Sequence, residues 1–139
     1  MAGSASDYLE NKILDHILGA TAYTAPGTIY IGLWTSALTD ASTGASAGEV
    51  SGGGYARVAL TNNTTNFPNA SAGSKSTGAA ADFGTASANL GTITHFALLD
   101  SATAGAGNIL YWADLTASKT VNSGDTYKFN SGAITVTQS

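Results

Sequence analysis

The sequence predicts an all-β domain, a sandwich or jelly roll of about seven to nine short strands with one α-helix at its N-terminal end. Short apolar or alternating segments recur along the chain, turns rich in glycine and asparagine separate them, and helical spacing of apolar residues occurs close to the N-terminus. At 139 residues the chain has the length of one domain. We therefore expect a single domain over residues 1–139, with the helix within 1–20 and the β-sandwich over 28–139.

The helix is predicted over residues 6–18, where Leu9, Ile13 and Ile17 recur at a spacing of four. A serine before the first turn can cap it, acidic residues follow near the positive end of the helix dipole, and Gly19 ends it. Polar residues occupy the opposite side. The apolar face must therefore pack against its own sandwich, against another copy of the chain, or against a different protein.

The first strand is predicted at residues 28–35, where Ile29, Ile31 and Leu33 point to one face and bulkier aromatic residues alternate with them. Gly32 interrupts the second face. A glycine in the middle of a strand indicates a bulge or the close approach of another backbone.

The segment at residues 37–54 is rich in Ser, Thr, Ala and Gly and closes with three consecutive glycines. Loops of this length inside compact domains are usually functional, or flexible when the domain is alone. Because the segment has almost no apolar side chains to hold it in place, we expect it to contact a neighbouring subunit, which would order it.

The most apolar part of the chain consists of two runs at 93–99 and 109–115, joined by small residues, which predict a β-hairpin. Both faces of each run are largely apolar, so we expect this hairpin inside the sandwich rather than at its edge. The other strands are shorter, and at most one is expected between residues 62 and 84. They are predicted at 55–61, near 82–83, and at 115–121, 126–129 and 133–137.

The composition excludes several classes of function. Charged residues make up 10% of the chain, and its five basic residues are scattered in a chain of net charge −4. A nucleic-acid-binding surface needs clustered basic residues, so we expect no nucleic-acid partner. No apolar run reaches the length of a membrane span and the N-terminus lacks an export signal, so we expect no membrane partner. Without cysteine, neither disulfides nor thiolate metal sites are available.

The sequence carries no catalytic or cofactor motif that we recognise. His95 has Asp100 five positions further on and Asp114 across the predicted hairpin, but no nucleophile in a known motif accompanies them, which favours a structural histidine. We therefore predict a protein that is not an enzyme and has no catalytic residue, no cofactor and no metal ion. Exposed aromatic rings suit both protein interfaces and stacking on sugars, although core packing is their usual role. The candidate interface residues are Leu9, Ile13, Ile17, Trp34, Tyr55 and Trp112.

Several segments together carry a resemblance to a known family. They are YLENKILDH at 8–16, AYTAP at 22–26, IGL at 31–33, GGYARV at 53–58, NFP at 66–68 and THF at 94–96. In this order, over most of the chain, they resemble the small virion proteins of tailed bacteriophages that are usually labelled tail fibre proteins. The resemblance implies a structural role in the virion and brings no catalytic residues with it.

The chain lacks the heptads and repeats of a fibre shaft, so a compact module is the better interpretation. We expect a module on the exterior of the virion, of the capsid-decoration (cement) type or the tail-fibre type, that is made in the host cytoplasm and acts through protein-protein contacts. Its expected partners are capsid or tail subunits and copies of itself, with a homotrimer favoured. The alternative is a receptor module on the phage tail that binds a glycan of the host surface.

Overall fold

The computed structural model describes residues 4–138, which fold into nine strands and one α-helix. All strand pairs in this range are antiparallel, and they form three sheets. The predicted all-β sandwich with an N-terminal helix is confirmed. In chain order the elements are β1 (Ser4–Ala5), α1 (Asp7–Ile17), β2 (Thr28–Trp34), β3 (Val58–Thr61), β4 (Ser74–Ser76), β5 (Ala81–Thr85), β6 (Gly91–Leu99), β7 (Ile109–Val121), β8 (Thr126–Phe129) and β9 (Thr135–Thr137).

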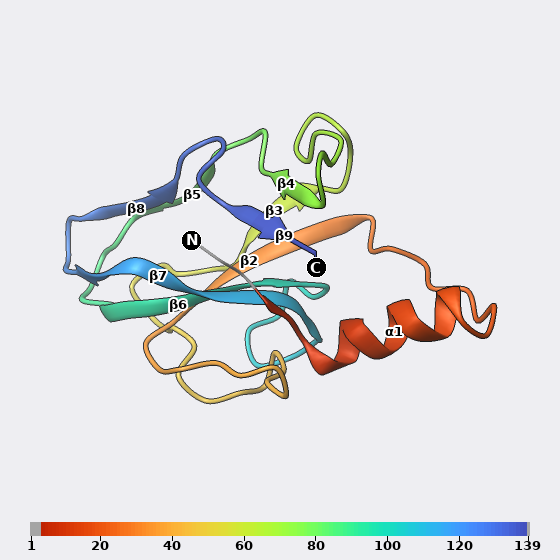
Figure 1. Ribbon diagram of the computed structural model, residues 1–139. Helices are drawn as coiled ribbons and strands as arrows, with labels where there is room; N and C mark the ends of the chain where they lie inside the picture. The colour runs from red at the N-terminus through yellow and green to blue at the C-terminus, as the bar shows by residue number, and fades with distance from the viewer. Residues whose placement is uncertain (1–3, 139) are drawn as a thin grey trace.

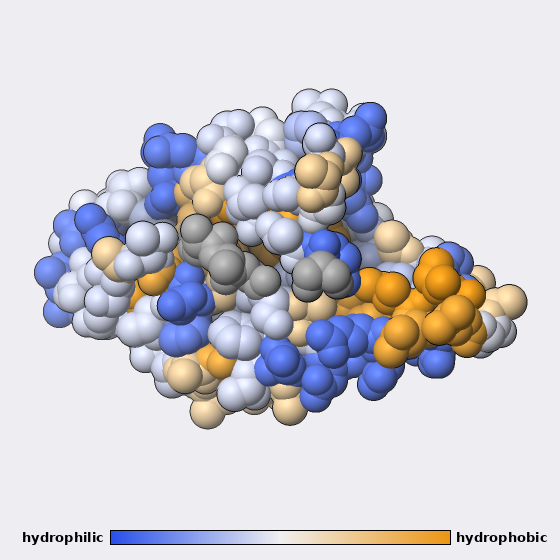
Figure 2. Space-filling model, in the orientation of Figure 1, coloured by the Kyte–Doolittle hydropathy of each residue, from blue (hydrophilic) through white to orange (hydrophobic). Residues whose placement is uncertain are grey.

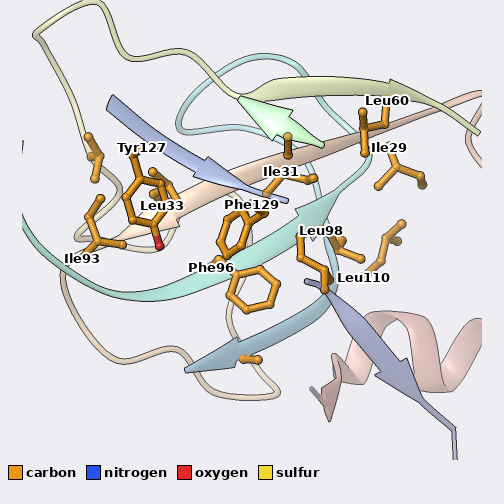
Figure 3. Close-up of a cluster of buried hydrophobic side chains, with 14 of the residues drawn as sticks. Ile29, Ile31, Leu33, Leu60, Ile93, Phe96, Leu98, Leu110, Tyr127 and Phe129 are labelled. Atoms are coloured by element: carbon orange, nitrogen blue, oxygen red, sulfur yellow. The ribbon is translucent and has the colours of Figure 1, made fainter. Parts of the chain in front are cut away.

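Two layers of β-structure enclose the main core (Figure 1). The larger layer is a five-stranded sheet in the order β1-β7-β6-β2-β3, and the pairs β5-β8 and β4-β9 lie over one of its faces. Aromatic rings of β8 reach down to this sheet, as Figure 3 shows, and the ring centroids of Phe129 and Phe96 are 5.0 Å apart. Because aromatic side chains bury the largest apolar areas, this cluster contributes much of the attraction between the layers.

The predicted hairpin is formed by β6 and β7 and lies in the middle of the large sheet, as expected. Strand β6 pairs with β7 on one side and with β2 on the other. Its side chains alternate between two buried environments: Ile93, Phe96 and Leu98 belong to the main core, whereas Ala97 and Leu99 belong to a smaller cluster on the opposite face. Both faces of the segment from Phe96 to Leu99 are therefore buried, which explains why both are apolar there.

Trp34 and Leu38 complete the smaller cluster on the second face of the large sheet. Gly32 lies beneath it, and a Cβ atom at this position would come within 2.9 Å of the Trp34 ring and 3.2 Å of the Leu99 side chain. Strand β2 pairs with β3 and β6 without a register shift. The prediction of a bulge or a close backbone at Gly32 is thus wrong, since side chains fill the space instead.

The loop over residues 37–54 is ordered by its own chain, which corrects the expectation that a neighbouring subunit orders it, while its contact with another subunit stays a prediction. Leu38 and Val50 are buried, and Glu49 forms an isolated β-bridge with Trp34. The indole N–H of Trp34 also donates a hydrogen bond to the carbonyl oxygen of Ser46, at 3.2 Å. The loop has no continuous apolar face, and two buried apolar side chains together with several polar contacts hold it in place instead.

Arg57 is the main polar anchor of this loop. Its Nε donates to Glu49 Oε1 at 2.7 Å and its Nη2 to Glu49 Oε2 at 2.8 Å. The same guanidinium donates to the carbonyl oxygens of Ser101, Ala106 and Gly44, and thereby joins the 37–54 loop to the β6-β7 connection. Alternation over 55–61 predicted Arg57 on a half-exposed strand, but β3 begins only at Val58 and Arg57 is buried.

The structure also contains a strand that the sequence analysis missed. Both β4 and β5 lie in the stretch for which at most one strand was predicted. Strand β4 (Ser74–Ser76) pairs with β9, and Ser74 lies opposite Thr137. Its three residues are polar, so no alternation of apolar side chains marks it as a strand.

Candidate interaction surface

Helix α1 is fixed to the sandwich at its N-terminal end. The buried Ser6 caps the helix: its Oγ accepts a hydrogen bond from the backbone N–H of Leu9 at 3.2 Å and donates to the carbonyl oxygen of Ile109. The Ser6 N–H donates to the carbonyl oxygen of Leu110 at 2.9 Å. Capping and attachment to β7 therefore use the same residue.

The remainder of α1 extends away from the sandwich (Figure 1). Exposure rises along it: Leu9 is 5% exposed, whereas Leu14 is 56%, Ile17 68% and Leu18 76% exposed. Figure 2 shows the apolar side chains gathered over the far end of the helix. Because most of the remaining surface in this view is polar, we name Leu14, Ile17 and Leu18 the helix tip and treat it as a candidate contact surface.

The chain returns from the helix tip to the sandwich through residues 18–27. The N–H of Leu18 donates to the carbonyl oxygen of Leu14 at 2.7 Å, and that of Thr21 donates to the carbonyl oxygen of Asp15 at 3.0 Å. The backbone N–H of Tyr23 then donates to Nδ1 of His16 at 3.3 Å. These bonds hold the returning segment against the helix.

An open apolar groove of about 470 Å³ lies between α1, the returning segment and the β4-β9 pair. Most of its walls are apolar side chains, and within residues 4–138 Lys75 is the one charged residue that lines it. The principal side chains that line it are Leu9, Ile13, Tyr23, Phe67, Tyr111 and Val136. A concave apolar surface of this kind is suited to aliphatic or aromatic side chains of a partner.

Two tyrosines of the groove have raised pKa values. Burial is the main cause for Tyr23, with smaller contributions from nearby Tyr8, Asp100 and Tyr111, and burial is the cause for Tyr111. The Tyr111 hydroxyl donates to Oε1 of Gln138 at 3.1 Å. Both phenols therefore remain neutral and add no charge to the groove.

The structure brings only part of the predicted interface set to this surface. Leu9 and Ile13 line the groove and Ile17 forms the helix tip beside it, while Tyr55 and Trp112 lie elsewhere. The role of these residues in an interface stays a prediction.

Trp34 has no exposed surface in the folded chain, so the hypothesis that it contacts another protein is wrong. It fills the second face of the sheet, beneath the 37–54 loop.

Tyr55 and Trp112 are half-buried, and each uses its polar atom within the chain. The Tyr55 hydroxyl accepts a hydrogen bond from the N–H of Leu33 and donates to Glu49 Oε1, both at 3.0 Å. Burial first, and the carboxylate of Glu49 to a smaller degree, raise the pKa of Tyr55 well above its usual value. The indole N–H of Trp112 donates to Asp40 Oδ1 at 2.9 Å.

The groove residues outside α1 were missed by the sequence analysis. They come from three segments that are far apart along the chain, around Tyr23, from Phe67 to Lys75, and around Val136. A local pattern could indicate the apolar face of α1, but only the sandwich topology brings the other walls of the groove to it.

The contacts of His95 are those of a structural residue in the β6-β7 pair. Its Nδ1 lies 2.8 Å from Thr94 Oγ1, and its ring packs near Trp112 with centroids 6.2 Å apart. Asp114 lies opposite His95 in the β6-β7 ladder. Among residues 4–138, no three His, Cys, Asp or Glu side chains are grouped as metal ligands. The described part of the chain also has no helix with the length and apolar character that a membrane crossing needs.

Comparison with known proteins places the chain in a family of virion proteins. A family model described as podophage GP4 fiber I protein gp80 matches residues 4–137. No curated protein matches the chain significantly. The match covers nearly all of the sequence, including α1, the groove and every strand of the sandwich. The chain therefore belongs to the podophage fibre protein family described as fiber I protein gp80.

Proposed function

We propose that the protein is a non-enzymatic structural module of the tail-fibre type, exposed on the outside of the virion, that acts through protein-protein contacts. The observation that carries this proposal is the exposed apolar helix tip beside an open apolar groove. Soluble chains rarely leave such surface uncovered unless it binds something. The description of the family as a fibre protein supports the tail-fibre type over the capsid-decoration type.

Copies of the chain itself are among the proposed partners, with a trimer as the assembly. The helix tip and the groove are different surfaces of one chain, and a contact between different surfaces can close into a ring. Any closed ring covers each tip and each groove once, and the trimer expected from the sequence is one such ring. Light scattering measures its mass in solution, and a mass other than three copies would overturn the trimer.

Location is tested by labelling intact virions with gold-conjugated antibodies against the protein. Labelling at the tail is the expected result. Labelling of the head would overturn the tail-fibre type in favour of capsid decoration, and labelling only after particle disruption would overturn the exterior position.

Attachment is tested by counting copies of variant protein per virion. Ile17→Asp places a carboxylate on the exposed helix tip and should reduce the copy number strongly, whereas Asn130→Asp adds the same charge at an exposed position after β8 and should leave it unchanged. Ile13→Asp is the weaker test because Ile13 is half-buried against the core, so misfolding would also reduce incorporation. Equal copy numbers for Ile17→Asp and wild type would remove α1 from the attachment surface.

A second candidate function is glycan binding at Trp112. Its half-exposed ring is held by Asp40, whose Oδ1 also accepts a hydrogen bond from the Ser4 hydroxyl at 2.9 Å. An oriented aromatic ring beside a carboxylate is the kind of surface on which sugar rings stack. Trp112→Ala should then abolish binding to host polysaccharide while the circular dichroism spectrum stays the same. Retained binding, or no binding by the wild type, would reject this candidate.

A further inference from the structure

We propose that the groove of one copy receives the helix tip, Leu14, Ile17 and Leu18, of a second copy of the same chain. This inference rests on the proposed self-association and specifies the surfaces through which it occurs.

Each chain carries both halves of this contact but cannot join them by itself. Leu9 and Ile13 of α1 form one wall of the groove, whereas the helix tip is absent from its lining and faces solvent. Helix α1 is fixed at Ser6 and by the bonds of the returning segment, so the tip cannot fold back into its own groove without breaking them. The tip of another copy has no such restriction.

The lining of the groove is complementary to a segment that carries aliphatic side chains and, close to them, a carboxylate. Lys75 is the one charged residue among the described residues that line it, and Nζ of Lys75 lies 3.4 Å from the carbonyl oxygen of Phe67. Within residues 4–138 the one ion pair joins Arg57 to Glu49, so Lys75 has no carboxylate partner there. An occupant that brings a carboxylate to Lys75 would be complementary in charge.

Helix α1 has the required composition. Glu10 is exposed and lies beside Ile13 and Leu14, with which it lines a shallow depression next to the groove. When a tip with aliphatic side chains enters the groove of a neighbour, Glu10 of the same helix would approach the rim, where Lys75 of the neighbour lies. The second copy therefore fits both the apolar walls and the single charge.

The absence of cysteine from the sequence allows a direct test by cross-linking. One chain would carry Ile17→Cys and another, with a different tag, Ala70→Cys on the rim of the groove. After co-expression, a short bismaleimide should join the two different chains, while neither variant alone should cross-link. Lys12→Cys, on the exposed side of α1 opposite the helix tip, replaces Ile17→Cys as the matched control and should not cross-link to Ala70→Cys.

The outcomes distinguish this contact from the self-association on which it rests. Cross-linking of Ile17→Cys to itself, without the mixed product, would overturn the proposal because it would place two helix tips against each other. An oligomer by light scattering without any mixed product would overturn the contact and leave self-association standing. A monomer at all concentrations would overturn both.

Charge reversal supplies an independent readout. Lys75→Glu should weaken association about threefold to tenfold, since Glu10 of the neighbour would then face a like charge. Adding Glu10→Lys to the same chain should restore the wild-type association constant, because every contact in the ring would again pair opposite charges. If the double variant stays as weak as Lys75→Glu, Glu10 does not reach the groove and the proposed orientation is wrong.

Discussion

At the scale of single residues, Arg57 holds the 37–54 loop and the β6-β7 connection together by hydrogen bonds rather than by apolar packing. It makes five hydrogen bonds, to both oxygens of Glu49 and to three backbone carbonyls. Its partners are between 8 and 49 positions away in the sequence. Local alternation could not indicate these bonds, because they depend on which loops meet after the sheet has formed.

Replacing Arg57 with methionine should lower the free energy of unfolding by about 3 to 5 kcal/mol, because the Glu49 carboxylate would lose its ion-pair partner and three carbonyl groups would lose the donor that Arg57 supplies. Urea denaturation measures the change. Lys128→Met on the exposed face of β8 is the matched control and should change stability by less than about 0.5 kcal/mol. A loss below about 1 kcal/mol for Arg57→Met would show that the loops do not depend on this side chain.

Because of Tyr127, we expect the free energy of unfolding to fall at alkaline pH. Burial raises its pKa to about 12, whereas a tyrosine in an unfolded chain has a pKa of about 10. The folded chain therefore keeps a proton that the unfolded chain releases, so the stabilising contribution is complete below pH 10 and disappears as the pH rises towards about 12. Urea midpoints measured across this range should fall less steeply for Tyr127→Phe than for the wild type. Identical slopes would mean that Tyr127 ionises normally in the folded protein.

At the scale of elements, the sequence predicts those whose signals are local. The predicted limits of α1 and β2 agree with the observed ones to within one residue, since a serine cap, regular apolar spacing and a following glycine are all present in the sequence. The loop at 37–54 was mispredicted because its order comes from isolated contacts, such as those of Leu38 and Glu49. Strand β4 was missed because its polar residues pair with a strand near the C-terminal end of the chain.

Gly44 lies where the 37–54 loop contacts the β6-β7 connection, so a substitution there tests whether these two loops form one unit. A Cβ atom there would overlap the carbonyl oxygen of Ala106, and the Gly44 N–H donates to the carbonyl oxygen of Gly107 at 3.0 Å. Gly44→Ala should therefore separate the loops, cost about 1 to 3 kcal/mol, and increase amide hydrogen exchange in both. Gly27→Ala is the control, because nothing lies within 4 Å of its Cβ position. Faster exchange in only one loop would contradict the coupling.

At the scale of the whole molecule, the candidate surface was only half visible in the sequence. The spacing of Leu9, Ile13 and Ile17 indicates an apolar helix face, but not that Leu9 is buried while Ile17 is exposed. The gradient arises because α1 is attached to β7 at its first turn and then leaves the sandwich. The groove beside it depends on a topology that brings β4 and β9 next to the helix, so periodicity alone could not reveal it.

Self-association through the helix tip should make thermal stability depend on protein concentration. Binding that occurs only in the folded state stabilises it by mass action, so the wild-type unfolding midpoint should rise over a concentration range of about a hundredfold. Ile17→Asp should remove this dependence, because a carboxylate on the helix tip cannot enter an apolar groove without losing its hydration. Differential scanning fluorimetry measures the midpoints, with Asn130→Asp, an exposed change away from α1, as the control that keeps the wild-type dependence. At the lowest concentration all three proteins should unfold together, because Ile17 is 68% exposed and contributes little to the fold of a single copy. A wild-type midpoint that does not change with concentration would contradict self-association, and an early midpoint of Ile17→Asp at every concentration would instead place Ile17 in the core of the monomer.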